Sequence, residues 1–282
     1  MGKQVLQSET GKGLSILIEL NRIYQADCFD LLVRVKPESV DLVFTDPPYL
    51  KSITGAHKSW ELKPHDFEVL AESFNQVLKR TGQIAIFGDY ITQVTITNSF
   101  QKHFEFRFYW VWVKSNGQPV NRFQPRSNVE LISVWKKKGV KTGEVTYNPI
   151  SLWKGKPYIK RFQSDNRTRK GKIASYTTIN KTGDRYPDQV LCFPSKDNLS
   201  YEERTAHPTQ KPLGLCRYVI KSLSSPGDVI LDPFSGSGSI SISAHLENRQ
   251  FIGIEKNTQY WNESIRRLKR YQAQLRLSEV VG

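Results

Sequence analysis

Two short segments of the chain combine residue types that could bind a small molecule and act on it chemically. The first, Asp232-Pro-Phe-Ser-Gly-Ser-Gly238, follows an apolar strand and precedes a helix. Its glycines allow a sharp turn and let a ligand approach main-chain N–H groups at a helix N-terminus. Glu255 ends the next strand, where a carboxylate can accept hydrogen bonds from ribose hydroxyls. Together these features predict a nucleoside-cofactor site. A nicotinamide or ATP site fits less well, because neither the full G-x-G-x-x-G spacing nor a phosphate-binding lysine is present.

The second segment is Thr45-Asp46-Pro47-Pro48-Tyr49, directly after the apolar run from Val40 to Phe44. Two consecutive prolines fix φ and stiffen the turn, so the Asp46 carboxylate and the nearby carbonyl oxygens are held rigidly at the edge of a sheet. Tyr49 places an aromatic ring beside these acceptors. Rigid acceptors next to a stacking face suit a planar group that carries an exocyclic amine.

An alternation of strands and helices must position both segments. Apolar runs predict strands, and apolar residues at helical spacing predict helices. Their alternation implies a parallel sheet covered on both faces, so we expect an α/β fold. The expected strands are 22–25, 40–44, 83–87, 104–114, 129–135, 228–232 and 251–254, and the expected helices are 28–34, 66–80, 212–223, 239–248 and 257 to about 275.

The middle of the chain departs from this alternation. Residues 137–206 are rich in Lys, Gly, Ser, Thr and Asn, so we expect an inserted module outside the sheet, between halves at 1–136 and 207–282. Within 136–172, twelve Lys and Arg stand against two acidic residues, a net charge of +10. Aromatic residues interleave with these cations, which favours a nucleic-acid surface over a merely solvated or disordered basic face.

The composition of the whole chain agrees with a polyanionic partner. Among 282 residues, 41 Lys and Arg outnumber 27 Asp and Glu, for a net charge of +14. No apolar run approaches the ~20 residues that span a bilayer, and the first residues lack the apolar segment of a secretory signal. Three scattered cysteines without metal-ligand spacing predict neither a disulfide framework nor a metal site. We therefore expect a cytoplasmic protein with no membrane partner.

These segments resemble, in order, those of the S-adenosylmethionine-dependent amino-methyltransferases of DNA, the adenine-N6/cytosine-N4 family. Because Asp46-Pro-Pro-Tyr49 precedes the Asp232–Gly238 loop, the order resembles that of the permuted β class of these enzymes. The other matching segments are 24–28 with 37–46, Trp112–Asn116 with Pro119, Arg122 and Glu130, and His207-Pro-Thr-Gln-Lys-Pro212. The resemblance implies a Rossmann-like methyltransferase sheet, circularly permuted, with 1–136 as the catalytic half, 207–282 as the cofactor-binding half and 137–206 as an inserted target-recognition module.

The resemblance also implies that S-adenosyl-L-methionine is the cofactor and assigns residues to it. These are Asp27 and Cys28 at its adenine, Glu255 at its ribose, Asp232, Phe234, Gly236 and Gly238 in the loop around it, and Thr209, Gln210 and Lys211 at its methionine carboxylate. One departure is Ser239, where the family more often has Thr, which is a conservative change.

The implied catalytic segment is Asp46, Pro47, Pro48 and Tyr49. The Asp46 carboxylate and the Pro47 carbonyl would accept hydrogen bonds from the target amine, and Tyr49 would stack on the base. Such chemistry cannot reach a base inside a duplex, so the base must be flipped out.

Several alternatives for the function stay open. Adenine N6 is the expected target, because the tetrapeptide begins with Asp rather than Ser, but the same chemistry serves cytosine N4. A catalytically inactive nucleic-acid-binding regulator could use the same fold, although Asp46, Tyr49, Glu255 and the glycine loop are all intact. An RNA or protein-amide substrate is a further alternative, and the basic, aromatic insert disfavours only the protein. The expected partners are double-stranded DNA, a second copy of the chain and a cognate restriction endonuclease.

Overall fold

The computed structural model describes residues 5–6, 18–50, 62–118, 122–123, 125–162 and 176–281. The chain divides into two compact units: a core domain of Met1–Asn148 with Gln189–Gly282, and a hairpin unit of Pro149–Asp188. Within the described residues, no helix combines the length and the apolar character needed to cross a membrane.

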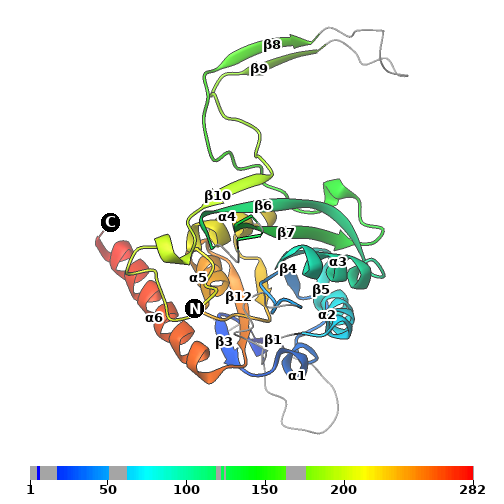
Figure 1. Ribbon diagram of the computed structural model, residues 1–282, viewed down its shortest axis with the longest axis vertical. Helices are drawn as coiled ribbons and strands as arrows, with labels where there is room; N and C mark the ends of the chain where they lie inside the picture. The colour runs from blue at the N-terminus through cyan, green and yellow to red at the C-terminus, as the bar shows by residue number, and fades with distance from the viewer. Residues whose placement is uncertain are drawn as a thin grey trace. The chain divides into compact units, whose positions relative to one another are not determined.

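An eight-stranded sheet forms the centre of the core domain, in the order β10-β6-β7-β5-β4-β11-β12-β3 (Figure 1). Its neighbouring strands run parallel except at β7, which is antiparallel to both β5 and β6. The strands are β3 (Arg22–Gln25), β4 (Val40–Thr45), β5 (Leu78–Gly88), β6 (Phe104–Gln118), β7 (Ser127–Lys137), β10 (Val190–Phe193), β11 (Val229–Asp232) and β12 (Gln250–Glu255). This mostly parallel sheet confirms the predicted α/β class. A separate short pair joins β1 (Val5–Leu6) to β2 (Ile18–Glu19).

Helices cover both faces of the sheet, α1–α3 on one and α4–α6 on the other (Figure 1). Because both faces are covered, the central strands read as nearly unbroken apolar runs, and Leu42, Val43 and Phe44 of β4 are all inaccessible to solvent. The helices are α1 (Cys28–Leu32), α2 (Pro64–Val77), α3 (Tyr90–Phe100), α4 (Leu213–Leu223), α5 (Ser239–Leu246) and α6 (Thr258–Val281), with two 3₁₀ turns, η2 (Thr142–Glu144) and η3 (Lys196–Asn198).

The pairing of β4 with β11 brings the two predicted chemical segments together. Ile230 lies beside Leu42 and Leu231 beside Val43, so the two strands end next to each other. β12 and β3 follow on the other side of β11. The carboxyl ends of these parallel strands therefore share one edge, which is where α/β sheets bind their ligands.

Several elements differ from the sequence-based expectations. The structure has a helix, α3, in a stretch for which no element was predicted. β10 lies within 137–206, which we expected to be outside the sheet, and it pairs in parallel with β6. The expected insert is therefore wider than the separate hairpin unit, because its flanks pack with the core domain.

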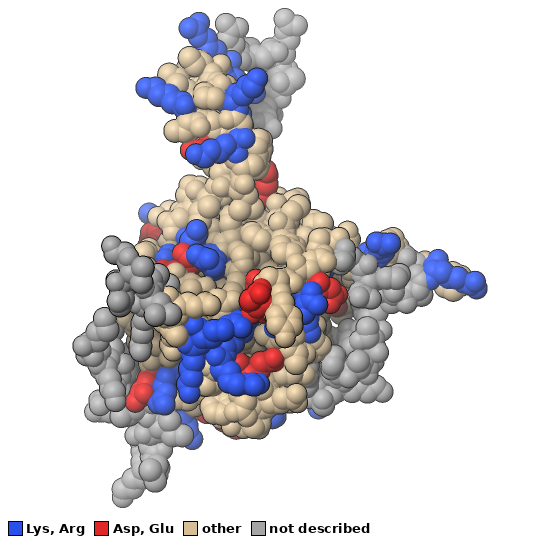
Figure 2. All heavy atoms as spheres, turned by 90° about the vertical axis from the view of Figure 1, so that its left-hand side faces the viewer, with Lys and Arg blue, Asp and Glu red and all other residues tan. Residues whose placement is uncertain are grey.

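The hairpin unit is a two-stranded antiparallel ribbon of β8 (Tyr158–Phe162) and β9 (Tyr176–Asn180). Arg185 organises its base, because the guanidinium lies 5.5 Å from the Trp153 ring and 5.0 Å from the Tyr158 ring and also bonds the Lys156 carbonyl. In Figure 2 the unit, at the top of the view, carries exposed cations along its length. Among the residues of this unit that the structure describes, the exposed Lys and Arg are Lys154, Lys156, Lys160, Arg161 and Lys181.

Candidate active site

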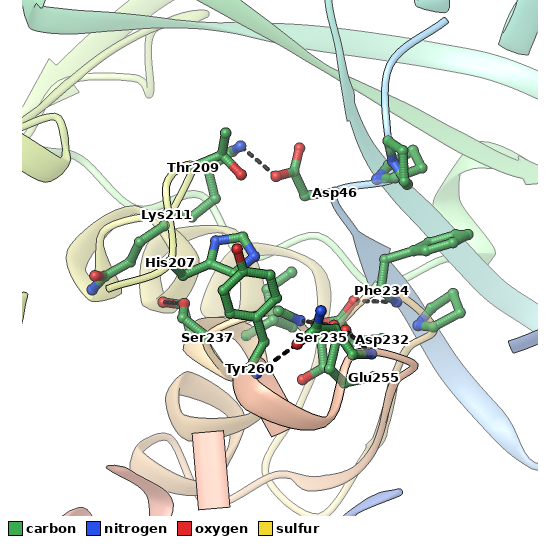
Figure 3. A pocket seen from close by; sticks show the side chains of 18 of the residues that line it. Asp46, His207, Thr209, Lys211, Asp232, Phe234, Ser235, Ser237, Glu255 and Tyr260 are labelled. Carbon is green, nitrogen blue, oxygen red and sulfur yellow. Dashed lines mark hydrogen bonds and ion pairs between the residues drawn. The ribbon is translucent and has the colours of Figure 1, made fainter. Parts of the chain in front are cut away.

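A cavity of about 800 Å³ opens at the shared edge of β3, β4, β11 and β12 (Figure 3). Every expected site residue except Gly238 lines it: Asp27, Cys28, Asp46, Pro47, Pro48, Tyr49, Thr209, Gln210, Lys211, Asp232, Phe234, Gly236 and Glu255. Six carboxyl groups and three lysines stand in its wall, within a chain of net charge +14. The cavity is therefore locally acidic and suits a ligand that carries positive charge.

The two glycines of the loop have a backbone conformation that residues with a side chain rarely adopt. Gly236 has φ +51° and Gly238 has φ +77°. A Cβ on Gly236 would lie 2.9 Å from the His207 ring, and one on Gly238 would lie 3.0 Å from the Cβ of Ser264. The loop thus needs glycine at both positions, for its conformation and for the space around it.

The Glu255 carboxylate is fixed at the cavity wall by two backbone donors. Its Oε2 accepts the Gly236 N–H at 2.8 Å, and its Oε1 accepts the Asn257 N–H at 2.7 Å. Burial raises the pKa of this carboxyl, although the backbone hydrogen bonds act in the opposite direction. Each oxygen keeps a further lone pair, so Glu255 can still accept ligand hydroxyls.

Asp232 joins the glycine loop to the Asp46 segment. Its Oδ1 accepts the Thr45 hydroxyl at 2.8 Å, deep in the core, and the Phe234 N–H at 3.3 Å. Burial raises the pKa of Asp232 to about 8, and the neighbouring carboxylates of Asp46 and Glu255 add to this rise. Asp232 is thus a structural link between the ends of β4 and β11.

Asp27 stands at the N-terminus of α1 on the same cavity. Its Oδ1 caps the helix by accepting the Phe29 N–H at 3.0 Å, and its Oδ2 accepts Lys256 Nζ at 2.8 Å. Burial acts to raise its pKa, but Lys256 and the Phe29 N–H together outweigh burial, so the pKa is lowered. Burial raises the pKa of the adjacent Cys28 thiol to about 12, so this thiol is not a nucleophile.

Asp46 carries hydrogen-bond donors on both carboxylate oxygens. Tyr49 donates its hydroxyl to Oδ1 at 3.1 Å, and Lys211 forms an ion pair with Oδ2 (Figure 3). Glu130 of β7 lies beside the same two donors, 3.2 Å from the Tyr49 hydroxyl and 3.3 Å from Lys211 Nζ. Lys114 of β6 pairs with the other oxygen of Glu130.

The pKa directions within this group follow from burial and from the two lysines. Burial raises the pKa of Asp46, Glu130 raises it further, and Lys211 only partly offsets both. For Glu130 burial also acts upward, but Lys211 and Lys114 together outweigh it and lower the pKa. The pKa of Lys211 is raised against its own burial by Asp46 and Glu130, so the ammonium stays charged.

The three expected site residues in the loop before α4 have different environments. The Gln210 side chain accepts the Thr205 N–H and donates to the Glu203 carbonyl, both at 2.8 Å, so it fixes the loop from inside. Thr209 is exposed at the cavity rim. Lys211 faces Asp46, whereas the resemblance had implied a contact with the methionine carboxylate.

Several cavity residues had no role assigned from the sequence. The rings of His207 and Tyr260 meet edge to face at 4.4 Å beside the glycine loop (Figure 3). Glu130 and Lys114 complete the charged group around Asp46. A signal did exist for Glu130, because a carboxylate within an otherwise apolar strand is a costly placement that needs partners.

A comparison with known protein families decides what this cavity belongs to. The model of a family described as DNA methylase, of the N6/N4 methyltransferase type, matches residues 40–266. The chain belongs to the N6/N4 DNA methylase family. The match runs from β4 into α6 and so includes both the Asp46 segment and the glycine loop.

Curated relatives agree with this assignment. The chain is 31% identical over 258 residues to the DNA adenine methyltransferase YhdJ of Escherichia coli (strain K12), covering 89% of this chain and 83% of the relative. It is 28% identical over 275 residues to the type II methyltransferase M.HinfI of Haemophilus influenzae, covering 89% and 68%.

Solved structures share the fold. The crystal structure of an M1.HpyAVI–SAM complex is 25% identical, with a TM-score of 0.62, and the alignment covers 88% of this chain and 98% of that one. The PvuII DNA methyltransferase, which is cytosine-N4-specific, is 18% identical with a TM-score of 0.63 and 89% coverage of both chains, and shows the fold alone.

This methylase uses S-adenosylmethionine, and the cavity fits that cofactor. Gly236, in a positive-φ conformation, brings its backbone to the cavity wall, and Glu255 presents a fixed acceptor beside it. The acidic wall suits the positive charge of a sulfonium. The protein is therefore an S-adenosylmethionine-dependent DNA methyltransferase of the N6/N4 type.

Proposed function

We propose that this methylase transfers a methyl group to the exocyclic N6 amine of adenine in a base flipped out of double-stranded DNA. The observation that carries the proposal is the placement of Asp46, Pro47 and Tyr49 in one cavity with the glycine loop and Glu255. The relative named for adenine methylation, YhdJ of Escherichia coli, supports N6 over cytosine N4. The type II relative supports a restriction-modification setting.

Two sets of residues in the cavity have separate tasks, one at the cofactor and one at the base. Glu255, Asp27 and the loop from Asp232 to Gly238 hold S-adenosylmethionine, which supplies an electrophilic methyl group on a sulfonium when bound. Asp46, Pro47 and Tyr49 hold the base. Both sets lie at the ends of neighbouring strands, so the rigid sheet sets their separation.

The catalytic task of the chain is to make a poor nucleophile reactive. The amine lone pair of adenine is delocalised into the ring. Hydrogen bonds from its two N–H groups to the Asp46 carboxylate and the Pro47 carbonyl favour a tetrahedral nitrogen, which frees that lone pair. Because both acceptors are fixed before the base arrives, positioning and preorganised dipoles supply most of the acceleration.

Asp46 also receives the proton that the nitrogen releases. Its raised pKa improves it as a proton acceptor relative to an exposed carboxylate. No strong base is needed, because the methylated amine is already acidic. The Tyr49 ring offsets part of the cost of unstacking, about 1–3 kcal/mol per stacked base.

Recognition of the DNA is assigned to the basic hairpin unit. The exposed cations of the hairpin unit meet phosphates, and its aromatic residues offer stacking surfaces.

Product analysis tests the proposal. The protein is incubated with unmethylated mixed-sequence DNA and S-adenosylmethionine carrying a deuterated methyl group, and the DNA is digested to nucleosides for mass spectrometry. Labelled N6-methyladenine is the expected product. Labelled N4-methylcytosine would correct the target base, and labelled RNA with unlabelled DNA in a parallel incubation would overturn the DNA substrate.

A further inference from the structure

The hydrogen bonding of Asp46 conflicts with its proposed task. A carboxylate that accepts the target amine needs a free lone pair directed into the cavity. Here Tyr49 occupies Oδ1 at 3.1 Å and the Lys211 ammonium occupies Oδ2. An ammonium on a carboxylate also withdraws negative charge and weakens it as an acceptor and as a base. Each oxygen keeps a further lone pair, but Asp46 accepts the amine at full strength only when these donors leave it.

A second acceptor stands ready for both donors. The Oε2 atom of Glu130 lies 3.2 Å from the Tyr49 hydroxyl and 3.3 Å from Lys211 Nζ. Tyr49 has a single hydroxyl proton, so it can serve Asp46 or Glu130 but not both at full strength. Lys211 is a compact charge at the end of a flexible stem, so a small rotation transfers it from one carboxylate to the other.

Glu130 is itself held in place from the far side. Lys114 pairs with its Oε1, which leaves Oε2 directed at the two donors. Asp46, Glu130, Lys211 and Lys114 balance as two negative and two positive charges, all with largely buried side chains. If Lys211 left Asp46 without another partner, a buried ammonium would stand uncompensated, which is strongly unfavourable.

We propose that Glu130 is a positioning residue that takes over both donors of Asp46 as the target amine enters, so that Lys211 and Tyr49 release the carboxylate without losing their partners. This inference rests on the proposed role of Asp46 as the amine acceptor. In the resting protein the donors keep Asp46 oriented. In the complex with the base they lie on Glu130, and the freed carboxylate faces the amine.

The charged groups around Asp46 set the pH signature of this arrangement. They come from the loop before α4, from β7 and from the end of β11: Lys211, Glu130 and Asp232. Glu130 raises the pKa of Asp46 through like-charge repulsion. A neutral residue at position 130 therefore shifts the deprotonation of Asp46, and with it the acid limb of the rate–pH profile, to lower pH.

Two substitutions test separately the charge of Glu130 and the length of its side chain. Glu130→Gln keeps the shape, removes the charge and leaves Lys211 paired with Asp46. We expect kcat on unmethylated plasmid DNA to fall about tenfold or more with little change in KM, and the acid limb to move to lower pH. Glu130→Asp keeps the charge but withdraws it from both donors, so kcat falls while the acid limb stays close to that of the wild type.

The matched control is Glu144→Gln, which removes an exposed carboxylate that is paired with Arg80 and does not line the cavity. It leaves kcat and the pH profile unchanged. Calorimetric titration with S-adenosylhomocysteine and a thermal melt show whether each variant is folded and binds cofactor. If Glu130→Gln destroys the fold, Glu130→Asp still tests the inference through its rate and its unshifted acid limb.

The outcomes distinguish this inference from the proposed function. An active wild type with Glu130 variants of unchanged kcat, or an acid limb that moves to higher pH in Glu130→Gln, overturns the role of Glu130 and leaves the role of Asp46 intact. Full activity in Asp46→Ala overturns the proposed role of Asp46, and the role of Glu130 with it.

Discussion

Substituting Gly238 by Ala tests whether the conformation of the glycine loop, rather than its flexibility, holds the cofactor. Gly238 has φ +77°, and an added Cβ would lie 3.0 Å from the Cβ of Ser264 and 3.3 Å from Cδ1 of Ile23. Gly139 provides a matched control, because its φ is +76° and an added Cβ would meet nothing within 4 Å. The two substitutions share the backbone strain and differ in the contact.

The expected magnitudes follow from that difference. A left-handed alanine costs about 1–2 kcal/mol, and the lost freedom of the unfolded chain returns about 0.4–1 kcal/mol, so Gly139→Ala should cost about 1 kcal/mol. Gly238→Ala adds overpacking against α6 and β3, about 1–3 kcal/mol more. The displaced loop should also weaken cofactor binding by about tenfold, or about 1.4 kcal/mol.

Urea denaturation and calorimetric titration with S-adenosylhomocysteine measure the two effects. Gly139→Ala should lose a little stability and keep its cofactor affinity. Gly238→Ala should lose more of both. Equal losses of stability in the two variants, together with wild-type cofactor affinity in Gly238→Ala, would refute the reasoning.

Three further predictions concern the core link, its protonation and the hairpin unit. Thr45→Val removes the buried donor to Asp232 and should lower the free energy of unfolding by about 1–3 kcal/mol. The control Thr95→Val loses only an exposed hydrogen bond to the Ile91 carbonyl and should change this free energy little. Equal losses in the two variants would contradict the structural link between Thr45 and Asp232. Asp232 has a folded pKa of about 8, above its ordinary value, so its contribution to stability is full below about pH 4 and is lost as the pH rises through 8. Urea unfolding between pH 5 and 8 should show a decline in the wild type that Asp232→Asn lacks, and parallel curves would argue against a buried protonated carboxyl. DNA affinity should fall steeply with salt, and the double variant Lys160→Ala, Arg161→Ala should reduce the slope of log affinity against log salt concentration by about two. The control Lys102→Ala, which removes an exposed cation beside Glu72, should leave this slope unchanged. An unchanged slope in the double variant would show that the hairpin unit is not part of the DNA interface.

The sequence predicts the frame of the sheet well where its strands are buried on both faces. β4, β11 and β12 differ from the predicted ranges by one or two residues, because their apolar runs leave no choice of exposed face. The edge strand β3 also begins and ends where expected. The helix α3 went unpredicted, since its many β-branched residues favour a strand. Its N-cap Asp89 and its packing against β5 and β7 override that local preference.

For the site, the sequence predicts the lining residues but not their ion-pair partners. Motifs at strand ends identify the residues that line the cavity, since the sheet forces those ends together. Ion-pair partners do not follow from spacing, because Lys211 is separated from Asp46 by most of the chain. The pairing of Lys211 with Asp46 and Glu130 depends on side-chain packing at the cavity floor, which leaves no local pattern. β10 shows the same limit for the fold, because its place in the sheet follows only from its pairing with β6.

The most direct test of the account is single-turnover methyl transfer by Asp46→Ala beside Glu144→Gln and the wild type, on the same unmethylated DNA with a labelled methyl group. Asp46→Ala should bind DNA and S-adenosylhomocysteine much as the wild type does, but its transfer rate should fall by about 100-fold or more, because the amine loses its acceptor. Glu144→Gln should transfer at the wild-type rate. A transfer rate in Asp46→Ala within a few-fold of the wild type would contradict the central claim that this carboxylate holds the target amine.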